Sequence, residues 1–380
     1  MKRLFISMDF PPDKGGIQDY TYGLVSEIDP SETYVLTRPF SNKEMEQEFD
    51  KQVPFTIYRA NIYNNSSFFA FIISTFVLLA SLIRLKLIYR YREIHFVNSF
   101  PIGLAGLVMK YVFRVPYYCY IHGLDFKCKI QSRQFPYFIK VLHGAKKIIA
   151  NSSYTKLMMV NQGIPEHRIS IIAPGLNTKK LLQKSGNVKG FKERYGLNDK
   201  KVLITVARLV ERKGHDVVLK ALPKVVEQID SIKYVICGTG PYKDQLSQMV
   251  EQYRLSDYVV FTGELTEEEL NAAYQSADIF IMPSREIKEK GDVEGFGIVF
   301  LEANYYKVPV IGGNSGGIPD AIVKDKTGFL IDPLNEEEIA QKILTLLQDE
   351  KLAYQMGESG YFWVVNHCLW KHRVKLLDTI

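Results

Sequence analysis

The sequence predicts an α/β protein made of two doubly wound, parallel-sheet domains in tandem. Short β-rich runs alternate with runs of helix length along almost the whole chain, which is the pattern of parallel strands covered by helices on both faces. The polar segment 183–200 interrupts this alternation and is the best candidate for a linker. The length of 380 residues also favours two domains over one.

The first strand is expected near the N-terminus, in the run KRLFIS. Its apolar stretch is too short for a signal peptide, and Asp9 followed by Pro11 and Pro12 ends it. Further strand-like runs in this half are EIHFVNS, PYYCYIHG, KKIIANSS and RISIIAPG. We therefore expect residues 1–185 to form an N-terminal domain.

A second series of strand-like runs follows the polar segment: KVLITVAR, IKYVICG, YVVFTGE, DIFIMPS, VPVIGG and GFLIDP. Thr266 with Glu269, and Asn335 with Glu338, have the spacing of a capping box at a helix start. We expect residues 198–360 to form a C-terminal domain. Parallel sheets bind ligands at the carboxyl ends of their strands, and the cleft between two such domains is the natural binding site.

The cysteines and acidic residues exclude some classes of chemistry. The four cysteines lie far apart, which predicts reduced thiols in a cytoplasmic protein and no disulfide framework. No Asp-x-Asp pair occurs, and no histidine cluster has the spacing of metal ligands. The sequence therefore favours chemistry that is independent of a metal.

The net charge of +6 is unevenly distributed. Residues 84–147 contain twelve Lys and Arg but only two acidic residues, so they carry +10 and the rest of the chain −4. A basic face with aromatic neighbours suits anionic lipid headgroups or nucleic acid, and no nucleic-acid-binding motif is present. An anionic membrane surface is a candidate partner, and a merely solvated basic face is the alternative.

One segment, residues 68–83 (FFAFIISTFVLLASLI), has the composition of a membrane helix. It holds sixteen residues, whereas a helix that spans a bilayer needs about 20. A buried or partly buried helix is the favoured interpretation, and a surface that leans on a bilayer is the alternative.

The stretch EGFGIVFLE carries two carboxylates, Glu294 and Glu302, around a glycine-rich turn. It follows the strand-like run DIFIMPS, and its second half has helical composition. A glycine turn that leads into a helix N-terminus offers free amides and a positive dipole end, which favour a phosphate. Carboxylates beside a diphosphate make sense where they accept hydrogen bonds from flanking hydroxyls, as a nucleotide-sugar supplies. A capping acid and an exposed helix residue are the alternative.

Cationic and small residues follow other strand ends. Arg208 and Lys213 in RLVERKGHD come after VLITVA, where two fixed cations can neutralise a departing diphosphate. Gly15 and Gly16 after the first strand allow close approach of a ligand, although no third glycine completes a dinucleotide fingerprint. His122 in YIHGLDF stands at another strand end, where a structural role is the alternative.

Together, these motifs resemble the retaining glycosyltransferases of family 4. The resemblance rests on EGFGIVFLE, RLVERKG, GGNSGGIPD and the glycine-rich first loop, which occur in the family's order and cover nearly the whole chain. It implies the GT-B fold: two Rossmann-like domains facing a cleft, with a C-terminal helix, here 361–380, that crosses back to the N-terminal domain. DFPPDKGGIQ and GDVEGFGIVFLEA look closest to bacterial phosphatidylinositol-mannoside mannosyltransferases, which use GDP-mannose.

The resemblance also implies roles for individual residues. Arg208 and Lys213 would meet the donor diphosphate, Glu294 the transferred sugar and Glu302 the ribose, and His122 would line the reaction centre. The wider set implied to bind the nucleotide-sugar is Gly15, Gly16, Gly238, Leu265, Phe296, Gly297, Ile298, Val299 and Glu302. Asn177 stands where many relatives have Asp, so no role is carried onto it.

The implied function is metal-independent, retaining transfer of a hexose to a hydroxyl of a lipid-linked or glycan acceptor. The expected donor is GDP-mannose, with a UDP-sugar as the alternative, and the expected location is the cytoplasm or the inner face of the cytoplasmic membrane. Two other readings stay open: a nucleotide-sugar 2-epimerase of the same fold, and a non-catalytic nucleotide-sugar-binding subunit. An epimerase would change the donor without an acceptor, and a binding subunit would show no turnover.

Overall fold

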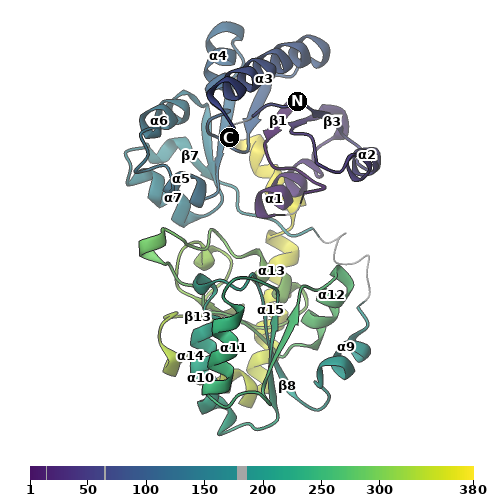
Figure 1. Cartoon of the computed structure of the whole chain (residues 1–380), viewed down its shortest axis with the longest axis vertical. Helices are drawn as coiled ribbons and strands as arrows, with labels where there is room; N and C mark the ends of the chain where they lie inside the picture. Colours follow the sequence, from purple (N-terminus) through teal and green to yellow (C-terminus); the bar gives the residue numbers. More distant parts are fainter. Residues whose placement is uncertain (14, 64–65, 178–185) are drawn as a thin grey trace. The chain divides into compact units, whose positions relative to one another are not determined.

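The computed structural model describes residues 1–13, 15–63, 66–177 and 186–380, which form two compact units (Figure 1). The first unit comprises Met1–Gly175 together with Trp370–Ile380, and the second comprises Leu176–Leu369. Each unit is a parallel sheet with helices packed on it. The predicted α/β class with two doubly wound, Rossmann-like domains is confirmed.

The first unit is built on a seven-stranded sheet in the order β3-β2-β1-β4-β5-β6-β7, and all neighbouring strands are parallel. Leu4 and Ile6 belong to one hydrophobic cluster and Phe5 to another, because successive side chains of a strand point to opposite faces. Both faces of the sheet are thus buried, which accounts for the continuous apolar runs. The strands are β1 (Arg3–Ser7), β2 (Thr33–Thr37), β3 (Thr56–Arg59), β4 (Glu93–Phe96), β5 (Tyr117–Ile121), β6 (Lys147–Ala150) and β7 (Ile169–Ile171).

Helices bury both faces of this sheet. The Leu4 side is covered by side chains of α3, α4 and α6, and the Phe5 side by side chains of α1 and of the C-terminal segment. The helices are α1 (Gly16–Val25), α2 (Lys43–Gln52), α3 (Phe68–Tyr89), α4 (Leu104–Phe113), α5 (Leu124–Lys127), α6 (Phe135–Gly144) and α7 (Ser153–Val160).

The C-terminal segment is part of the first unit. It consists of α16 (Trp370–Arg373) and the 3₁₀ helix η6 (Val374–Thr379). Trp370 is buried and packs edge-to-face on Tyr20, with 5.0 Å between ring centroids. The sequence predicted one helix over 361–380; instead, α15 (Glu350–His367) ends before Cys368, and a new short helix begins at Trp370.

An ion-pair network fixes this segment to the first strand. Arg3 of β1 pairs with the buried carboxylate of Glu93 at 2.7 Å and with Asp378 at 2.7 Å. His95 lies 3.2 Å from Glu93 and stacks between Phe5 and Tyr118. Burial disfavours the ionised form of Glu93, but His95 and Arg3 together lower the pKa of Glu93 to about 2.

The second unit is built on a six-stranded parallel sheet in the order β10-β9-β8-β11-β12-β13. The first strand in sequence, β8, lies between β9 and β11, so the chain winds outward in one direction and then in the other. The strands are β8 (Lys201–Val206), β9 (Ile232–Cys237), β10 (Val259–Gly263), β11 (Ile279–Met282), β12 (Val310–Gly313) and β13 (Gly328–Ile331).

Two helices of this unit begin at the capping residues that the sequence predicted. Thr266 caps α12 in a complete capping box with Glu269, as predicted. Asn335 caps α14 by accepting from the Glu338 amide, but the Glu338 side chain accepts from Asp332 instead of completing the box. The helices are α9 (Val188–Tyr195), α10 (His215–Val226), α11 (Lys243–Gln252), α12 (Glu267–Ser276), α13 (Ile298–Tyr305), α14 (Glu336–Gln348) and α15.

The structure adds detail to two segments that the sequence analysis singled out. The proposed linker 183–200 contains the helix α9, while residues 183–185 lie outside the described part of the chain. The apolar segment 68–83 is the start of the longer helix α3, and only four of that helix's 22 residues are buried. The linker candidate thus holds a helix, and α3 is the partly buried helix that the sequence analysis included in its favoured interpretation.

Candidate functional site

The predicted donor residues gather at the carboxyl edge of the second sheet. Strand β8 separates the two winding directions, and the loops after β8 and β11 leave it side by side at this edge. Such a switch point is where doubly wound sheets bind ligands. Ten of the thirteen residues singled out from the sequence belong to this unit, and the other three, Gly15, Gly16 and His122, belong to the first.

Lys213 and Glu294 meet directly at this edge. Lys213 ends the 3₁₀ helix η3 (Glu211–Lys213) after β8, and its Nζ donates to Glu294 Oε2 at 2.5 Å. Their side chains are 11 % and 15 % exposed, respectively. The structure thus unites residues that are far apart in sequence and that the motifs had assigned to one site.

A second cation, which sequence reasoning missed, completes this cluster. Arg212 donates from Nη1 to the same Oε2 atom of Glu294 at 2.5 Å, and its Nε lies 2.8 Å from Asp292. Burial disfavours ionisation of Glu294, but the charges and hydrogen bonds of Lys213 and Arg212 outweigh it and lower the pKa of Glu294. Glu294 is therefore an ionised carboxylate in a largely buried position. The only sequence signal for Arg212 was its place beside Lys213 in ERKG.

The glycine-rich turn brings the Glu294 loop into helix α13. Gly297 caps this helix with φ of 90°, a left-handed conformation that favours glycine. Phe296 is buried and anchors the turn, and Ile298 and Val299 form the first turn of the helix. The amides at this end carry the positive end of the helix dipole, so the turn offers an anion-binding position beside Glu294.

The loop after β12, GNSGG, packs against the backbone of the Glu294 loop. The Gly317 amide donates to the Glu294 carbonyl oxygen at 2.9 Å. A Cβ at Gly316 would collide with that same carbonyl oxygen, so the close approach requires glycine. This contact gives the GGNSGG motif its structural reason: it fixes the backbone that carries Glu294.

Glu302 lies one helix turn further on and has a defined partner. Its Oε2 accepts a hydrogen bond from the Tyr274 hydroxyl at 2.7 Å, and Tyr274 stacks on Tyr306 with 5.6 Å between ring centroids. Tyr306 in turn donates to Asn271 at 2.9 Å. This aromatic pair holds the Glu302 carboxylate at the edge of α13, and neither tyrosine was identified from the sequence.

The remaining predicted donor residues line neighbouring strand ends. Arg208 follows β8 and has an exposed side chain. Gly238 follows β9, with φ of 131°, and its amide donates to Gly263 at 2.8 Å. Leu265 follows β10 and is half-buried. These residues share the carboxyl edge of the sheet with Glu294.

A buried ion pair supports the loop after β11. Arg285 makes a two-pronged contact with Asp216 of α10, with both N–O distances at 2.9 Å. Next to it, His215 is fully buried, and neither of its ring nitrogens has a hydrogen-bond partner within the described chain. Burial, with the positive charges of Lys213 and Arg285, lowers the pKa of His215 to about 3. His215 is therefore a neutral, buried residue at the start of α10, two positions after Lys213.

In the first unit, the loop after β1 is tied to the end of β4. Asn98 accepts from the Met8 amide at 2.7 Å and from the Ser7 hydroxyl at 3.1 Å. Gly15 and Gly16 lie at the start of α1, which this loop leads into. The Asn98 contacts were not visible in the sequence, because they join strands about 90 residues apart.

His122 follows β5 at the same edge of the first sheet. Its Nε2–H donates to the Val97 carbonyl at 3.2 Å, and its ring packs edge-to-face on Tyr20 at 5.0 Å. Burial lowers the pKa of His122 despite the nearby carboxylate of Asp125. The imidazole is therefore held neutral, which leaves Nδ1 as a hydrogen-bond acceptor.

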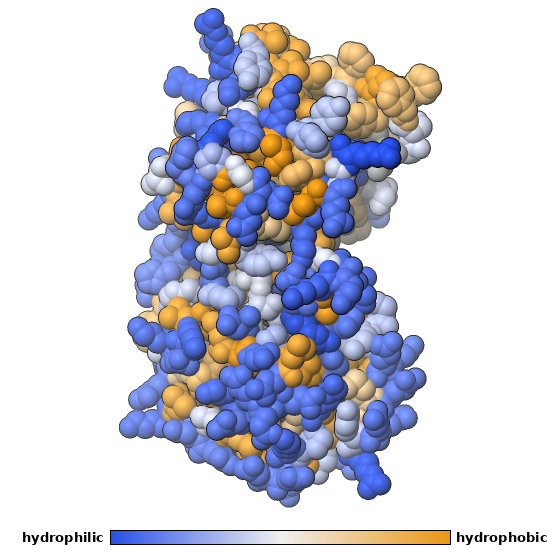
Figure 2. Space-filling model, turned by 90° about the vertical axis from the view of Figure 1, so that its left-hand side faces the viewer, coloured by the Kyte–Doolittle hydropathy of each residue, from blue (hydrophilic) through white to orange (hydrophobic). Residues whose placement is uncertain are grey.

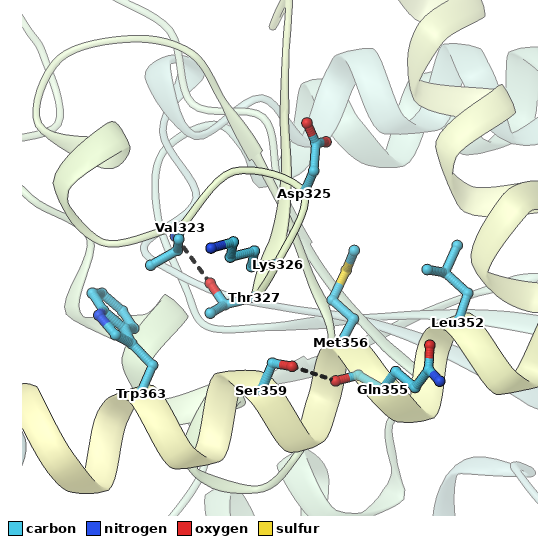
Figure 3. A pocket seen from close by; sticks show the side chains of 9 residues that line it. All are labelled: Val323, Asp325, Lys326, Thr327, Leu352, Gln355, Met356, Ser359 and Trp363. Atoms are coloured by element: carbon cyan, nitrogen blue, oxygen red, sulfur yellow. Dashed lines mark hydrogen bonds between the residues drawn. The ribbon is translucent and has the colours of Figure 1, made fainter.

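One groove in the described structure lies elsewhere, between α15 and the loop before β13 (Figure 3). Its volume is 510 Å³, and Lys326, Thr327, Met356 and Trp363 are among its lining residues. None of the thirteen predicted site residues lines it, so its size does not make it the donor site. Within the described residues, no cluster of three or more His, Cys, Asp or Glu side chains is arranged to hold a metal ion.

Comparison with known families gives two matches in tandem. The family described as "Glycosyltransferase Family 4" matches residues 14–180, and the family described as "Glycosyl transferases group 1" matches residues 189–363. Together they account for nearly the whole chain, and their junction lies in the polar segment noted in the sequence.

Curated relatives and solved structures agree with these matches. The chain is 29 % identical over 370 residues to a GDP-mannose-dependent alpha-(1-6)-phosphatidylinositol monomannoside mannosyltransferase of Mycolicibacterium smegmatis, covering 97 % of this chain and 95 % of the relative. It is 27 % identical to a GDP-mannose-dependent monoacylated alpha-(1-6)-phosphatidylinositol monomannoside mannosyltransferase of Corynebacterium glutamicum. That match covers 97 % of this chain and 95 % of the relative. The Anabaena protein HepE, solved with UDP, superimposes with a TM-score of 0.80 at 17 % identity, covering 100 % and 99 % of the two chains, and so shows the same fold.

Proposed function

We propose that this chain, which belongs to the family 4 glycosyltransferases and has the GT-B fold, transfers a hexose from a nucleotide diphosphate sugar to an acceptor hydroxyl. The observation that carries the proposal is the contact of Lys213 and Arg212 with Glu294 at the glycine-rich start of α13. It places an ionised carboxylate, two cations and a helix N-terminus within one strand-end cluster.

Each part of this cluster suits one part of the donor. Glu294 is ionised and accepts hydrogen bonds, so it can hold hydroxyls of the transferred sugar. The Lys213 ammonium has three N–H groups, and contact with Glu294 leaves it able to reach phosphate oxygens as well. The turn at Gly297 offers amides to the diphosphate, and Glu302 can accept from the ribose diol.

Bond cleavage then needs stabilisation of the leaving group. As the bond from the anomeric carbon to the phosphate oxygen breaks, negative charge grows on the diphosphate. Arg208 and Lys213 are assigned to neutralise it, a role that a metal ion plays in other enzymes. The leaving phosphate oxygen accepts the proton of the acceptor hydroxyl while the new bond forms on the same face, which retains the anomeric configuration.

The first unit is proposed to bind the acceptor. Gly15 and Gly16 let backbone approach the donor phosphate, and the neutral His122, with its Nδ1 acceptor, suits a hydroxyl near the reaction centre. We also assign the two domains the roles expected from the sequence, with the acceptor bound by the first and the nucleotide by the second.

The finer specificity follows the curated relatives. Their names specify GDP-mannose as donor and a phosphatidylinositol mannoside as acceptor. We therefore propose an α-mannosyltransferase that uses GDP-mannose and a lipid-linked or glycan acceptor in the synthesis of cell-envelope glycoconjugates. A UDP-sugar is the alternative donor. A lipid-linked acceptor would make the enzyme a peripheral protein of the cytoplasmic membrane's inner face.

A ligand screen followed by turnover tests this proposal. GDP-mannose, GDP, UDP-glucose and UDP are compared by thermal shift, since a ligand at 100 times its dissociation constant stabilises by about 2.7 kcal/mol. The expected result is a shift with GDP and GDP-mannose that Glu294→Gln reduces for the sugar nucleotide but not for GDP. An epimeric sugar formed from donor alone would identify an epimerase, and binding without any turnover would identify a non-catalytic subunit.

A further inference from the structure

Helix α3 is apolar on the side that faces away from the protein. Its buried residues, Ser74, Leu78, Leu82 and Leu85, form one narrow stripe against the sheet. A surface helix normally carries polar residues opposite such a stripe. Here the opposite side carries large apolar residues: Phe69 is 75 % exposed, Ile73 63 % and Phe76 68 %.

Helix α4 extends this surface. Because successive strand–helix units of a parallel sheet run in the same direction, the C-terminal ends of α3 and α4 lie at the same edge of the sheet, and the two helices pack together. Ten of the nineteen large apolar side chains that are exposed in the described structure belong to these two helices. We call this the α3–α4 surface; its most exposed members include Phe69, Ile73, Phe76, Leu87, Tyr111 and Val112.

The apolar patch is visible on the first unit. Figure 2 shows orange side chains gathered at the top of the molecule, at the height where Figure 1 places α3 and α4. A shallow hollow of 170 Å³ on α3 is lined by Phe71, Ile72, Thr75, Phe76 and Leu79 alone. A continuous exposed apolar area of this kind marks a binding surface.

Cations border the surface, and acidic residues are missing from its sequence. Residues 66–92 contain four Lys and Arg, all from Arg84 onward, and no Asp or Glu. Within the described chain, Arg84, Arg90 and Arg114 form no ion pair, and all three are exposed. Positive charge beside exposed apolar side chains complements an anionic lipid surface, which offers phosphates next to hydrocarbon.

We infer that the α3–α4 surface inserts into the interface of an anionic bilayer, with α3 lying along the membrane plane. The length of α3, 22 residues, corresponds to about 33 Å at 1.5 Å per residue. Its apolar residues enter the acyl-chain boundary, while Arg84, Arg90 and Arg114 contact lipid phosphates.

A membrane-spanning α3 does not fit the structure. Within the described chain it is the one helix long and apolar enough to cross a bilayer. Its stripe of Leu78, Leu82 and Leu85, however, belongs to the hydrophobic cluster of the first sheet. Spanning would require this stripe to leave the core, whereas in-plane insertion uses only the side that is already exposed.

This inference deepens the proposed function and rests on it for one point, that the acceptor is lipid-linked. The N-terminal end of α3 lies at the carboxyl edge of the first sheet, because α3 returns the chain from the end of β3 to the start of β4. Gly15 and His122 lie at that same edge. A bilayer along α3 would thus reach the acceptor side of this unit.

Vesicle sedimentation of the full chain tests the inference. The vesicles are phosphatidylcholine alone, or an equal mixture of phosphatidylcholine and phosphatidylglycerol, at low and high salt. We expect wild type to bind the anionic vesicles at least about tenfold more strongly at low salt, since each Lys or Arg near an anionic surface contributes about 1 kcal/mol. High salt should reduce this preference.

Two variants and matched controls separate the contributions. Phe69→Ser with Phe76→Ser should weaken binding to anionic vesicles by at least about tenfold, because burial of an aromatic side chain is lost. Arg84→Gln with Arg90→Gln should remove the preference for anionic lipid. One control is Phe362→Ser with Leu334→Ser, which are also exposed apolar residues but belong to the second unit. The other is Lys189→Gln with Lys200→Gln, and both controls should bind as wild type does.

Several outcomes would overturn the inference. They are unchanged binding of the Phe69/Phe76 variant, an equal loss in the Phe362/Leu334 control, or resistance of the vesicle-bound protein to alkaline carbonate, which indicates a spanning helix. Concentration-dependent self-association that the Phe69/Phe76 variant abolishes, without vesicle binding, would instead identify a dimer surface.

A separate readout distinguishes this inference from the proposed function. The Phe69/Phe76 variant should turn over donor with a water-soluble acceptor as wild type does. Vesicle binding with no transfer by wild type would refute the proposed function alone. Transfer without vesicle binding would refute the membrane inference alone. A Phe76→Trp variant adds a direct measure of depth, because acyl-brominated lipids should quench its fluorescence.

Discussion

The ammonium of Lys213 lies 2.5 Å from a carboxylate oxygen of Glu294, 81 residues further along the chain. The contact joins the loops that leave β8 and β11, the two strands that flank the switch point of the second sheet. It keeps Glu294 ionised in a largely buried position, and it ties a residue proposed to hold the sugar to one proposed to hold the diphosphate.

Replacing the cations should impair catalysis more than folding. Lys213→Ala and Arg208→Ala should each lower kcat by about 10²–10³, the usual effect of losing a group that stabilises developing charge. Lys220→Ala is a matched control, since Lys220 lies on the surface of α10 and pairs with Glu336 at 3.3 Å. Near-normal turnover in both site variants would refute the assignment. Turnover should also survive a chelator, and loss restored by magnesium would show that a metal is required.

Arg212 should act as a positioning residue for Glu294. Arg212→Gln and Asp292→Asn should each reduce kcat/KM for the donor, because both remove the ion pair in which Arg212 Nε lies 2.8 Å from Asp292. If Asp292 acts through Arg212, the two effects will not add, and a double-mutant cycle should give a coupling of at least about 0.5 kcal/mol. Additive effects would mean that the two residues act independently.

The acid limb of the pH profile should report the Lys213–Glu294 contact. Lys213 and Arg212 lower the pKa of Glu294 below the ordinary value of 4.5 for a glutamate. This carboxylate therefore stays ionised at a lower pH than an ordinary glutamate does. Removing Lys213 should raise that pKa, and the residual kcat/KM of Lys213→Ala should begin to fall at a higher pH than that of wild type. An acid limb at the same pH in both proteins would contradict this coupling.

His215 should make the protein less stable in acid. An unfolded histidine titrates near pH 6.5, whereas the folded pKa is about 3. As the pH falls below 6.5, only the unfolded chain takes up the proton, so the free energy of unfolding decreases by up to about 1.4 kcal/mol per pH unit. When the pH is lowered from 7 to 5, this proton uptake should reduce the free energy of unfolding of wild type by about 2 kcal/mol, and His215→Leu should not show this loss. Urea unfolding of both proteins at the two pH values measures the difference. Parallel pH dependence of the two proteins would disprove this.

The sequence was sufficient to predict features with local causes. The two sheets follow from alternating apolar runs, and the turn before α13 follows from the glycines of EGFG, whose backbone conformation is a local property. The role of Arg212 was not predictable, because its contacts depend on how two loops distant in sequence approach each other. The sequence left the exposure of α3 open between two interpretations for a different reason: an apolar helix has the same composition whether it is buried in protein or faces a membrane.

The stereochemistry of transfer tests the central claim most directly. Wild type is incubated with GDP-mannose, an α-linked donor, and a mannoside acceptor, and the anomeric coupling of the new linkage is measured by NMR. If Glu294 positions the sugar while the diphosphate leaves and the acceptor enters on the same face, the product is α-linked, and Glu294→Gln loses most of the activity through poor positioning. A β-linked product from wild type would contradict the mechanism and the roles assigned to Glu294 and Lys213.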